Sequence, residues 1–236
     1  MAWGWAGYRI SKPTLVFNSL NMNFNAWAGY NFSLEPIFAG GNVNFWGQLK
    51  NYWSVNFGIN RQGTGLSQGA LRGGPYLRSS GGWNNWFGVG SDARKRFTVE
   101  SSGWWFAADD RSRGNWGTDA ALAFRPSNGL SLSVASGYSY YANHLQYVAT
   151  AAGNDSRYII AHLAQDTVYV TLRLNYSVTP DLSIQFYGQP FISNGRYDAF
   201  KRITDPRAGY FQDRFQAYGT DEITFNTGDN AYQVRE

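Results

Sequence analysis

Apolar and polar residues alternate along much of this chain. In Thr167–Val178 every second side chain is apolar, and Leu182–Tyr187 repeats the alternation after the turn Thr179–Asp181. Successive side chains of a β-strand point to opposite faces, so the pattern predicts a hairpin with one apolar and one polar face. The hairpin alone does not tell which face meets water, because an apolar face fills the core of a soluble sandwich but contacts lipid in a membrane barrel.

The same two-residue period recurs throughout and predicts an all-β chain without helices. We expect about nine strands, and Trp3–Ser11 and Asp221–Asn226 are candidates for additional ones. Bacterial single-chain barrels usually have an even number of strands, so additional ones are needed. The nine expected strands cover Leu20–Trp27, Val43–Leu49, Trp53–Asn60, Trp83–Gly90, Phe97–Ala108, Trp116–Pro126, Leu130–Val148, Tyr158–Val178 and Leu182–Ser193.

Short and long connections alternate between these expected strands. A meander with short turns at one end and long loops at the other is typical of an outer-membrane barrel, and aromatic residues near both ends fit two membrane interfaces. The alternative is a soluble sandwich with aromatic core packing or a Trp-rich sugar-binding surface. The tight turns are Lys50-Asn51, Asp92–Arg94, Ser127–Gly129 and Thr179–Asp181, and the longer connections are Arg61–Gly82, Asp109–Asn115, Ala149–Arg157 and the residues after Asn194.

The composition limits the alternatives. The chain has 236 residues, a net charge of +4 and no cysteine, and its mean hydropathy is −0.41. No segment approaches the roughly 20 apolar residues of a transmembrane helix, whereas barrel strands need only about 9–11 residues. The absence of cysteine disfavours a disulfide scaffold, a zinc site or a thiol enzyme. The positive charge is scattered, and we therefore expect no nucleic-acid partner.

Several short motifs in a fixed order extend from Lys12-Pro13 to Gln189–Phe191. With them, the chain resembles the outer-membrane β-barrel domain of unknown function that follows a family-9-like carbohydrate-binding domain in many Gram-negative bacteria. The other matching stretches are Gly40–Asn44, Asn51–Ser54, Arg72–Pro75, Ser91–Arg96, Arg125-Pro126 and Leu172–Ser183.

The resemblance implies an antiparallel transmembrane β-barrel, or a large section of one, in the outer membrane of a Gram-negative bacterium. Residues 1–236 would form a single barrel region that is incomplete at both ends, so further strands or another chain are expected to close it. The expected partners are the lipid bilayer, lipopolysaccharide and a polar solute such as a saccharide. The C-terminal residues do not form the aromatic-ended strand that usually closes such barrels.

The residues expected to face inward are the candidate functional residues. Amides beside aromatic rings suit sugars, but they also suit a polar lumen that only satisfies its own hydrogen bonds. The Gly-rich loop 61–82 is either a plug or constriction folded into the lumen or an extracellular loop. The candidate lumen-lining residues are Asn21, Asn23, Asn25, Trp27, Asn44, Trp46, Gln48, Asn56, Glu100, Asp119, Arg125, Arg173, Asn175, Gln185 and Tyr187.

We expect no catalytic residue, metal site or cofactor. Ser139 near His144 is the best candidate pair for an outer-membrane hydrolase, but no Gly-x-Ser-x-Gly elbow is present. His144 and His162 without supporting carboxylates make a poor metal site, and acidic pairs such as Asp109-Asp110 lack calcium-loop spacing. The sequence thus predicts a channel or uptake component for polar solutes. The alternative is a barrel that anchors or docks other domains or chains without transport.

Overall fold

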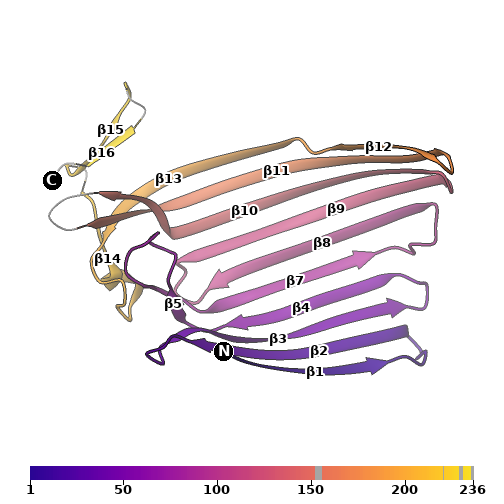
Figure 1. The fold of residues 1–236 in the computed structure, drawn as a ribbon, viewed down its shortest axis with the longest axis horizontal. Coiled ribbons are helices and arrows are strands. Elements are labelled where there is room, and N and C mark those ends of the chain that lie inside the picture. Colours follow the sequence, from indigo (N-terminus) through magenta and orange to yellow (C-terminus); the bar gives the residue numbers. More distant parts are fainter. Residues whose placement is uncertain (152–155, 220, 229–230, 235–236) are drawn as a thin grey trace.

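The computed structural model describes residues 1–151, 156–219, 221–228 and 231–234. They form one twelve-stranded antiparallel sheet and two small two-stranded sheets (Figure 1). The only helix among them is the short 3-10 helix Phe211–Arg214, and none of the described residues belongs to a helix long and apolar enough to cross a membrane. The chain is therefore all-β, as the two-residue period predicts.

The strands of the main sheet are ordered β1-β2-β3-β4-β7-β8-β9-β10-β11-β13-β14, and β12 also pairs with β11. Neighbours along the chain are neighbours in the sheet, so the predicted meander is confirmed. The strands are β1 (Ala2–Ile10), β2 (Phe17–Tyr30), β3 (Pro36–Leu49), β4 (Ser54–Gln62), β5 (Gly65–Ser67), β6 (Leu77–Ser79), β7 (Gly82–Gly90), β8 (Phe97–Ala108), β9 (Arg113–Ser127), β10 (Leu130–Ala151), β11 (Arg157–Thr179), β12 (Leu182–Gly188), β13 (Phe191–Ile203), β14 (Phe215–Ala217), β15 (Ile223–Asn226) and β16 (Ala231–Val234).

The expected strand Leu182–Ser193 is continued further than its sequence pattern indicates. Leu172 pairs with Gly188 and Tyr169 pairs with Phe191, so the register is the same on both sides of Pro190. Proline has no N–H for the ladder, and here its carbonyl accepts a hydrogen bond from Val170 N. Strands β12 and β13 are therefore one edge strand interrupted at Pro190, and the expectation of a loop after Asn194 is wrong.

The main sheet has two free edges among the described residues. Strand β1 forms one edge, at the bottom of Figure 1, and β12 and β13 form the other, at its top. The short strand β14 pairs with the end of β13, at the left of the figure. The expected strand Trp3–Ser11 is confirmed as β1. Asp221–Asn226 contributes β15, but β15 pairs with β16 in a separate sheet and does not extend the main one. The described residues thus form an open sheet, and no closed barrel is present.

The two faces of the sheet differ in chemistry. Residues that pair across antiparallel strands share a face, so the register assigns Val43, Phe57 and Phe87 to one face and Asn44, Trp86 and Ser139 to the other. The apolar face is broadly exposed, with Phe57 43% and Phe87 47% exposed. No second sheet covers it within the described residues, so the core of a soluble sandwich is missing here.

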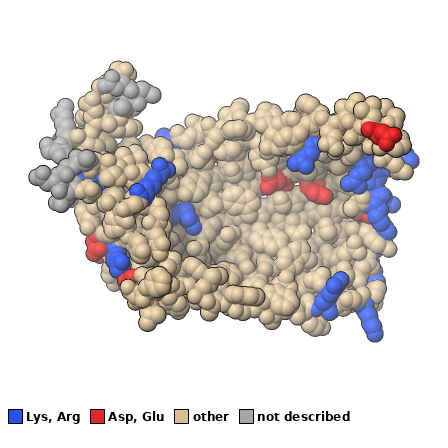
Figure 2. All heavy atoms as spheres, viewed as in Figure 1, with Lys and Arg blue, Asp and Glu red and all other residues tan. Residues whose placement is uncertain are grey.

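The polar face is hollowed along the middle of the sheet, as Figure 2 shows. The loop that follows β4, with its short strands β5 and β6, lies at the long-loop end of this face. Its Leu71 and Leu77 are buried with Ile160 of β11, and Leu145, Tyr147 and Tyr158 pack around them. The Gly-rich loop is thus anchored by a small apolar core at one end of the sheet.

Candidate functional site on the polar face

All fifteen candidate lumen-lining residues lie on the polar face. One cross-strand row runs from Asn21 through Trp46 and Asn56 to Asp119, and the next row runs from Gln48 to Glu100. Closer to the short turns, the neighbouring pairs are Arg173–Tyr187 and Asn175–Gln185. The remaining five, which follow by strand alternation or pairing, are Asn23, Asn25, Trp27, Asn44 and Arg125.

Amide side chains hydrogen bond to one another across this face. Asn42 Oδ1 accepts hydrogen bonds from Asn25 Nδ2 at 2.6 Å and from Asn44 Nδ2 at 2.9 Å. Farther along the same row, Asn60 Nδ2 donates to the carbonyl oxygen of Asn84 at 2.7 Å. Asn42, Asn60 and Asn84 were not among the sequence candidates, although the same two-residue period places them on the face.

Tryptophan rings lie beside these amides. The rings of Trp46 and Trp86 have centroids 5.9 Å apart. Both Trp86 and Trp104 lie over glycines of a neighbouring strand, since a Cβ at Gly58 would overlap the Trp86 ring and a Cβ at Gly117 would overlap the Trp104 ring. Glycine at these positions therefore lets large rings lie against the sheet.

Two carboxylates line a hollow in the middle of the polar face. Glu100 and Asp119 border a hollow of about 350 Å³, with Ser54, Asn56 and Ser102 as further polar lining and small residues such as Gly88 at its base. The Tyr169 hydroxyl donates a hydrogen bond to Asp119, while the Glu100 side chain is exposed. The hollow presents negative charge and hydroxyl groups to whatever occupies the polar face.

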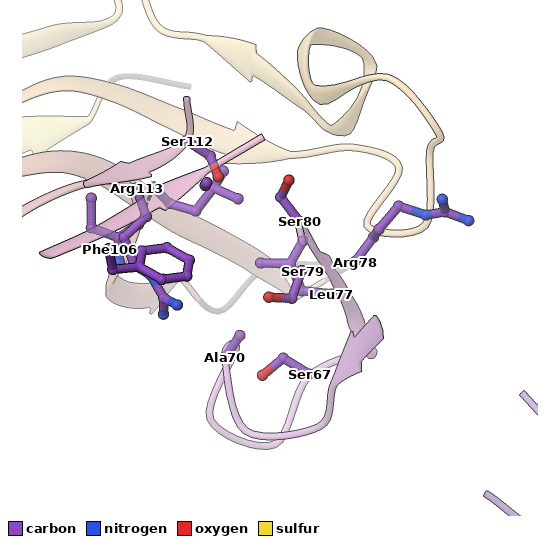
Figure 3. A pocket seen from close by; sticks show the side chains of 12 residues that line it. Ser67, Ala70, Leu77, Arg78, Ser79, Ser80, Phe106, Ser112 and Arg113 are labelled. Atoms are coloured by element: carbon purple, nitrogen blue, oxygen red, sulfur yellow. Dashed lines mark hydrogen bonds between the residues drawn. The ribbon is translucent and has the colours of Figure 1, made fainter. Parts of the chain in front are cut away.

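A second, smaller cavity lies between the Gly-rich loop and the sheet (Figure 3). It has a volume of about 120 Å³. The loop contributes Ser67 and Ser79, and the sheet contributes Phe106, Arg113 and Asn143. The guanidinium of Arg113 lies 4.3 Å from the centroid of the Phe106 ring, so this end of the face combines serine hydroxyls with a cation on an aromatic ring.

The segment that follows β13 fastens the loop in place. Arg78 N donates to the Pro206 carbonyl at 2.8 Å, and the buried Arg214 donates to the Arg78 carbonyl at 3.2 Å and to Asp110 at 3.3 Å. Burial lowers the pKa of Arg214, against the opposing effect of the Asp110 charge. Loop 63–81 and residues 204–214, which we call the cap, therefore form one packed unit at the long-loop end.

A second ion pair lies next to the cap. Arg61 at the end of β4 binds Asp109 through two hydrogen bonds of 2.8 and 2.6 Å. The hydrogen bonds from Arg61 lower the pKa of Asp109, partly offset by desolvation. Arg61 also lies 5.3 Å from the Trp83 ring centroid. The connection that carries Asp109 is a four-residue turn between β8 and β9, shorter than the expected loop Asp109–Asn115.

The two histidines contact each other but not the candidate nucleophile. Their rings stack with centroids 4.2 Å apart, and His162 Nδ1 lies 2.8 Å from the Asp198 carboxylate. Ser139 pairs with Thr167, and His144 lies five residues farther along β10, about 16 Å at the usual strand rise. The Ser139–His144 pair is therefore not assembled. The described residues also contain no group of three or more His, Cys, Asp or Glu side chains placed to hold a metal ion.

The comparisons with known proteins identify the family. A family model described as a domain of unknown function, DUF5916, matches residues 2–233. The chain belongs to this family. No curated protein and no solved structure matches the chain. DUF5916 is described without an activity, so the function of the chain rests on the geometry of its two faces.

Proposed function

We propose that this DUF5916 chain forms a section of a transmembrane β-barrel in the outer membrane of a Gram-negative bacterium, and that its polar face lines a passage for polar solutes. The observation that carries this proposal is the separation of the two faces. Val168, Leu172 and Phe186, all on one face, are 46%, 44% and 57% exposed. Such an apolar surface is costly in water, whereas lipid accommodates it.

The positions of outer aromatic residues fit a membrane thickness. Phe97 pairs with Phe124 near the short turns, and Trp105 pairs with Trp116 toward the long-loop end. Trp105 lies eight positions after Phe97, which corresponds to about 26 Å along the strand. A tilt of about 40° reduces this to about 20 Å, close to the roughly 25 Å apolar band between the aromatic girdles of an outer-membrane barrel.

A barrel in lipid must have no free edge, because each unpaired backbone group costs several kcal/mol in hydrocarbon. We therefore propose that further strands or another chain pair with β1 and with the β12–β13 edge. Lipopolysaccharide is the proposed contact of the outer leaflet at the long-loop end. Short turns are usually periplasmic and long loops extracellular, which sets this orientation.

The amides and tryptophans of the polar face support saccharides as the solute class. Sugar hydroxyls hydrogen bond to amides such as Gln48 and Asn56, and the apolar faces of pyranose rings stack on indoles such as Trp46 and Trp86. The resemblance to barrels that accompany a carbohydrate-binding domain favours the same class. The proposal includes no catalytic activity, cofactor or nucleic-acid partner.

The alternative function is an anchoring barrel that docks other domains or chains without transport. The cap favours this alternative, because it covers the long-loop end of the polar face. Conductance in planar bilayers separates the two functions. A channel gives discrete conductance steps that a permeating saccharide reduces, whereas an anchoring barrel gives none.

Residue-by-residue labelling tests the orientation of the faces. The chain has no cysteine, so single-cysteine variants report one site each. In the membrane-embedded protein, Val170→Cys and Leu172→Cys should react with a lipid-soluble maleimide and resist a water-soluble one. Arg173→Cys and Asn175→Cys, exposed on the polar face of the same strand, should show the opposite preference. Equal reactivity at all four positions, or the inverse pattern, would overturn the proposal.

Conductance also reports the charge of the hollow. If the polar face lines the passage, Glu100→Gln and Asp119→Asn should each lower the preference for cations, measured as the reversal potential in a salt gradient. The matched control is Asp181→Asn in the turn between β11 and β12, which should change the reversal potential much less. An unchanged preference in both hollow variants would place the conducting path elsewhere.

A further inference from the structure

We infer that the polar face carries a binding site for a phosphate group at the short-turn end of the sheet, where Arg96 and Arg125 lie opposite each other. The phosphate is either a free ion or part of a sugar. A hollow of about 320 Å³ marks the place. The inference adds a ligand to the proposed passage for polar solutes, and it rests on that proposal for the route by which the ligand arrives.

The strand register brings the two arginines together. Phe97 of β8 pairs with Phe124 of β9, so Arg96 and Arg125, each one position farther toward the turns, face each other. The backbone N–H of Arg125 donates to the Arg96 carbonyl at 2.7 Å, which continues the ladder to this pair. Because side chains alternate along a strand, both arginines lie on the polar face, whereas the two phenylalanines lie on the apolar face.

The two arginines have no carboxylate between them. Within the described residues, the side chain of Arg96 forms neither an ion pair nor a hydrogen bond. Arg125 donates one side-chain hydrogen bond, to the Ala93 carbonyl at 3.0 Å, and forms no ion pair with a described carboxylate. Like charges directly opposite each other destabilise a strand pair. An anion between the two guanidiniums would remove this repulsion.

The other charged groups nearby do not neutralise the pair. Arg94 is held by two hydrogen bonds to Asp92 and lies 3.2 Å from the Tyr52 ring centroid, so this ion pair belongs to the turn. Lys95 borders the hollow and is exposed. Glu100 lies four positions after Arg96 on the same face, about 13 Å away, which exceeds the Debye length of about 8 Å at physiological ionic strength. Figure 2 shows basic side chains gathered at this end of the sheet.

Charge and hydrogen-bonding groups favour a phosphate. A phosphate monoester carries a charge of about −1.5 to −2 at pH 7, which matches two guanidiniums better than the single charge of a carboxylate. Arginine binds phosphate oxygens through two parallel N–H donors. The hollow is also lined by Ser127, Asn128 and Ser131, whose hydroxyl and amide groups can donate further hydrogen bonds.

The polar row beside the hollow would contact a sugar that carries the phosphate. Ser131 pairs with Asn175 of β11, and Asn175 pairs with Gln185 of β12. Both amide side chains are exposed. A phosphorylated sugar would thus place its phosphate between the arginines and its hydroxyls along this row.

Isothermal titration calorimetry of the full chain in detergent micelles tests the site with inorganic phosphate, glucose 6-phosphate and glucose. At least one of the two phosphates should bind about tenfold or more tightly than glucose, as expected for hydrogen bonds to a charged group. Arg96→Gln/Arg125→Gln should remove this preference. Arg9→Gln/Lys12→Gln removes two positive charges near the β1 edge at the same end of the sheet and should keep it.

Two results of this titration would overturn the site. Equal binding of the three probes by the unmodified protein would show that no phosphate site exists. Equal losses in both double variants would show general charge attraction. A preference that only Arg96→Gln/Arg125→Gln removes supports the site, and the stronger of the two phosphates then identifies the ligand as the free ion or the phosphorylated sugar.

The stability of the protein gives a second readout. In chloride buffer without phosphate, Arg96→Gln should raise the urea midpoint, because it relieves the repulsion between the two arginines. Millimolar phosphate should raise the midpoint of the unmodified protein more than that of Arg96→Gln, since a ligand stabilises only the protein that binds it. A lower midpoint of Arg96→Gln in chloride buffer, or an equal effect of phosphate on both proteins, would overturn the site.

The labelling pattern at Leu172 and Arg173, measured on the same preparation, separates the two levels of inference. Loss of the alternating pattern would refute the membrane-spanning passage, whatever the calorimetry shows. An intact pattern without a preference for phosphate would refute only the phosphate site.

Discussion

Arg207 and Glu35 form an ion pair with an N–O distance of 2.6 Å, although they belong to opposite sides of the sheet. Glu35 lies in the connection between β2 and β3, next to the β1 edge, and Arg207 follows β13 at the other edge. The cap therefore reaches across the polar face at the long-loop end. A hydrogen bond from the Asn31 side chain, together with the charge of Arg207, lowers the pKa of Glu35, which keeps it ionised for this contact.

A charge swap tests whether this contact holds the cap across the sheet. Arg207→Glu and Glu35→Arg should each place like charges together and open the cap, which would raise the rate of trypsin cleavage within loop 63–81. The double variant restores the pair in reverse and should return the rate toward that of the unmodified protein. Three equal cleavage rates would show that the cap is held by other contacts alone.

The apolar anchor of the cap gives a larger expected effect. Leu71 is fully buried against Leu77 and Ile160. Leu71→Ala removes buried carbon atoms and leaves a cavity, so it should destabilise the cap by about 2–5 kcal/mol. Hydrogen exchange in residues 63–81 measures this local stability. Leu15→Ala is the matched control, because Leu15 is 98% exposed and should leave exchange unchanged.

Gly137 offers a test of packing in the middle of the polar face. Asp119 on β9 and Tyr169 on β11 meet over this glycine of β10, and a Cβ at Gly137 would overlap both the carboxylate and the ring. Gly137→Ala should therefore lower the urea midpoint, whereas Gly4→Ala, where a Cβ meets nothing within 4 Å, should not.

Tyr169→Phe isolates the hydrogen bond at the same place. It removes a hydrogen bond to a carboxylate but keeps the ring, so it should lower the free energy of unfolding by about 1.5–3 kcal/mol. Tyr169→Phe could prove neutral while Gly137→Ala is destabilising. That result would show that residue 137 is glycine because a Cβ has no room there, and not because the hydrogen bond between Tyr169 and Asp119 must be kept.

The faces of the strands could be predicted from sequence because the two-residue period is a local property. Asn21, Trp46 and Asp119 are far apart in the chain, yet each takes its face from its own strand, and the register then brings them into one row. The strand after Asn194 was missed because Gly195, Arg196 and Asp198 are polar or small, and only pairing with β11 makes this segment extended.

Contacts between chain segments that meet only in the folded protein could not be predicted from the sequence. The Arg207–Glu35 pair spans 172 positions, and the stacking of His144 on His162 follows from irregular pairing near Asn143 and His162. Such contacts depend on where two chain segments meet in space, and a local period does not encode this. The cap is therefore the part of the candidate site that only the structure reveals.

The stacked histidines predict a pH dependence of stability. Burial lowers the pKa of His144, and the nearby charges of His162 and Lys201 act in the same direction, while Asp198 opposes them. The Lys201 ammonium also donates to the His144 carbonyl at 3.0 Å. His144 of β10 and Lys201 of β13 both lie at the long-loop ends of their strands, beyond the proposed membrane-spanning part.

A lowered pKa in the folded state means that the unfolded chain binds the proton more readily. Above about pH 6.5 His144 is neutral in both states and has no effect on stability. As the pH falls below this value, the unfolded state gains protons first, so the free energy of unfolding should decrease until the folded state is also protonated.

Urea midpoints between pH 7.5 and pH 5 measure this decrease. His144→Gln should flatten the profile because it removes the titrating ring but retains a polar side chain of similar reach. Gln146→Asn, two residues along β10, is a control that should keep the pH dependence. A midpoint that rises as the pH falls would show that the attraction of Asp198 for a protonated His144 outweighs burial.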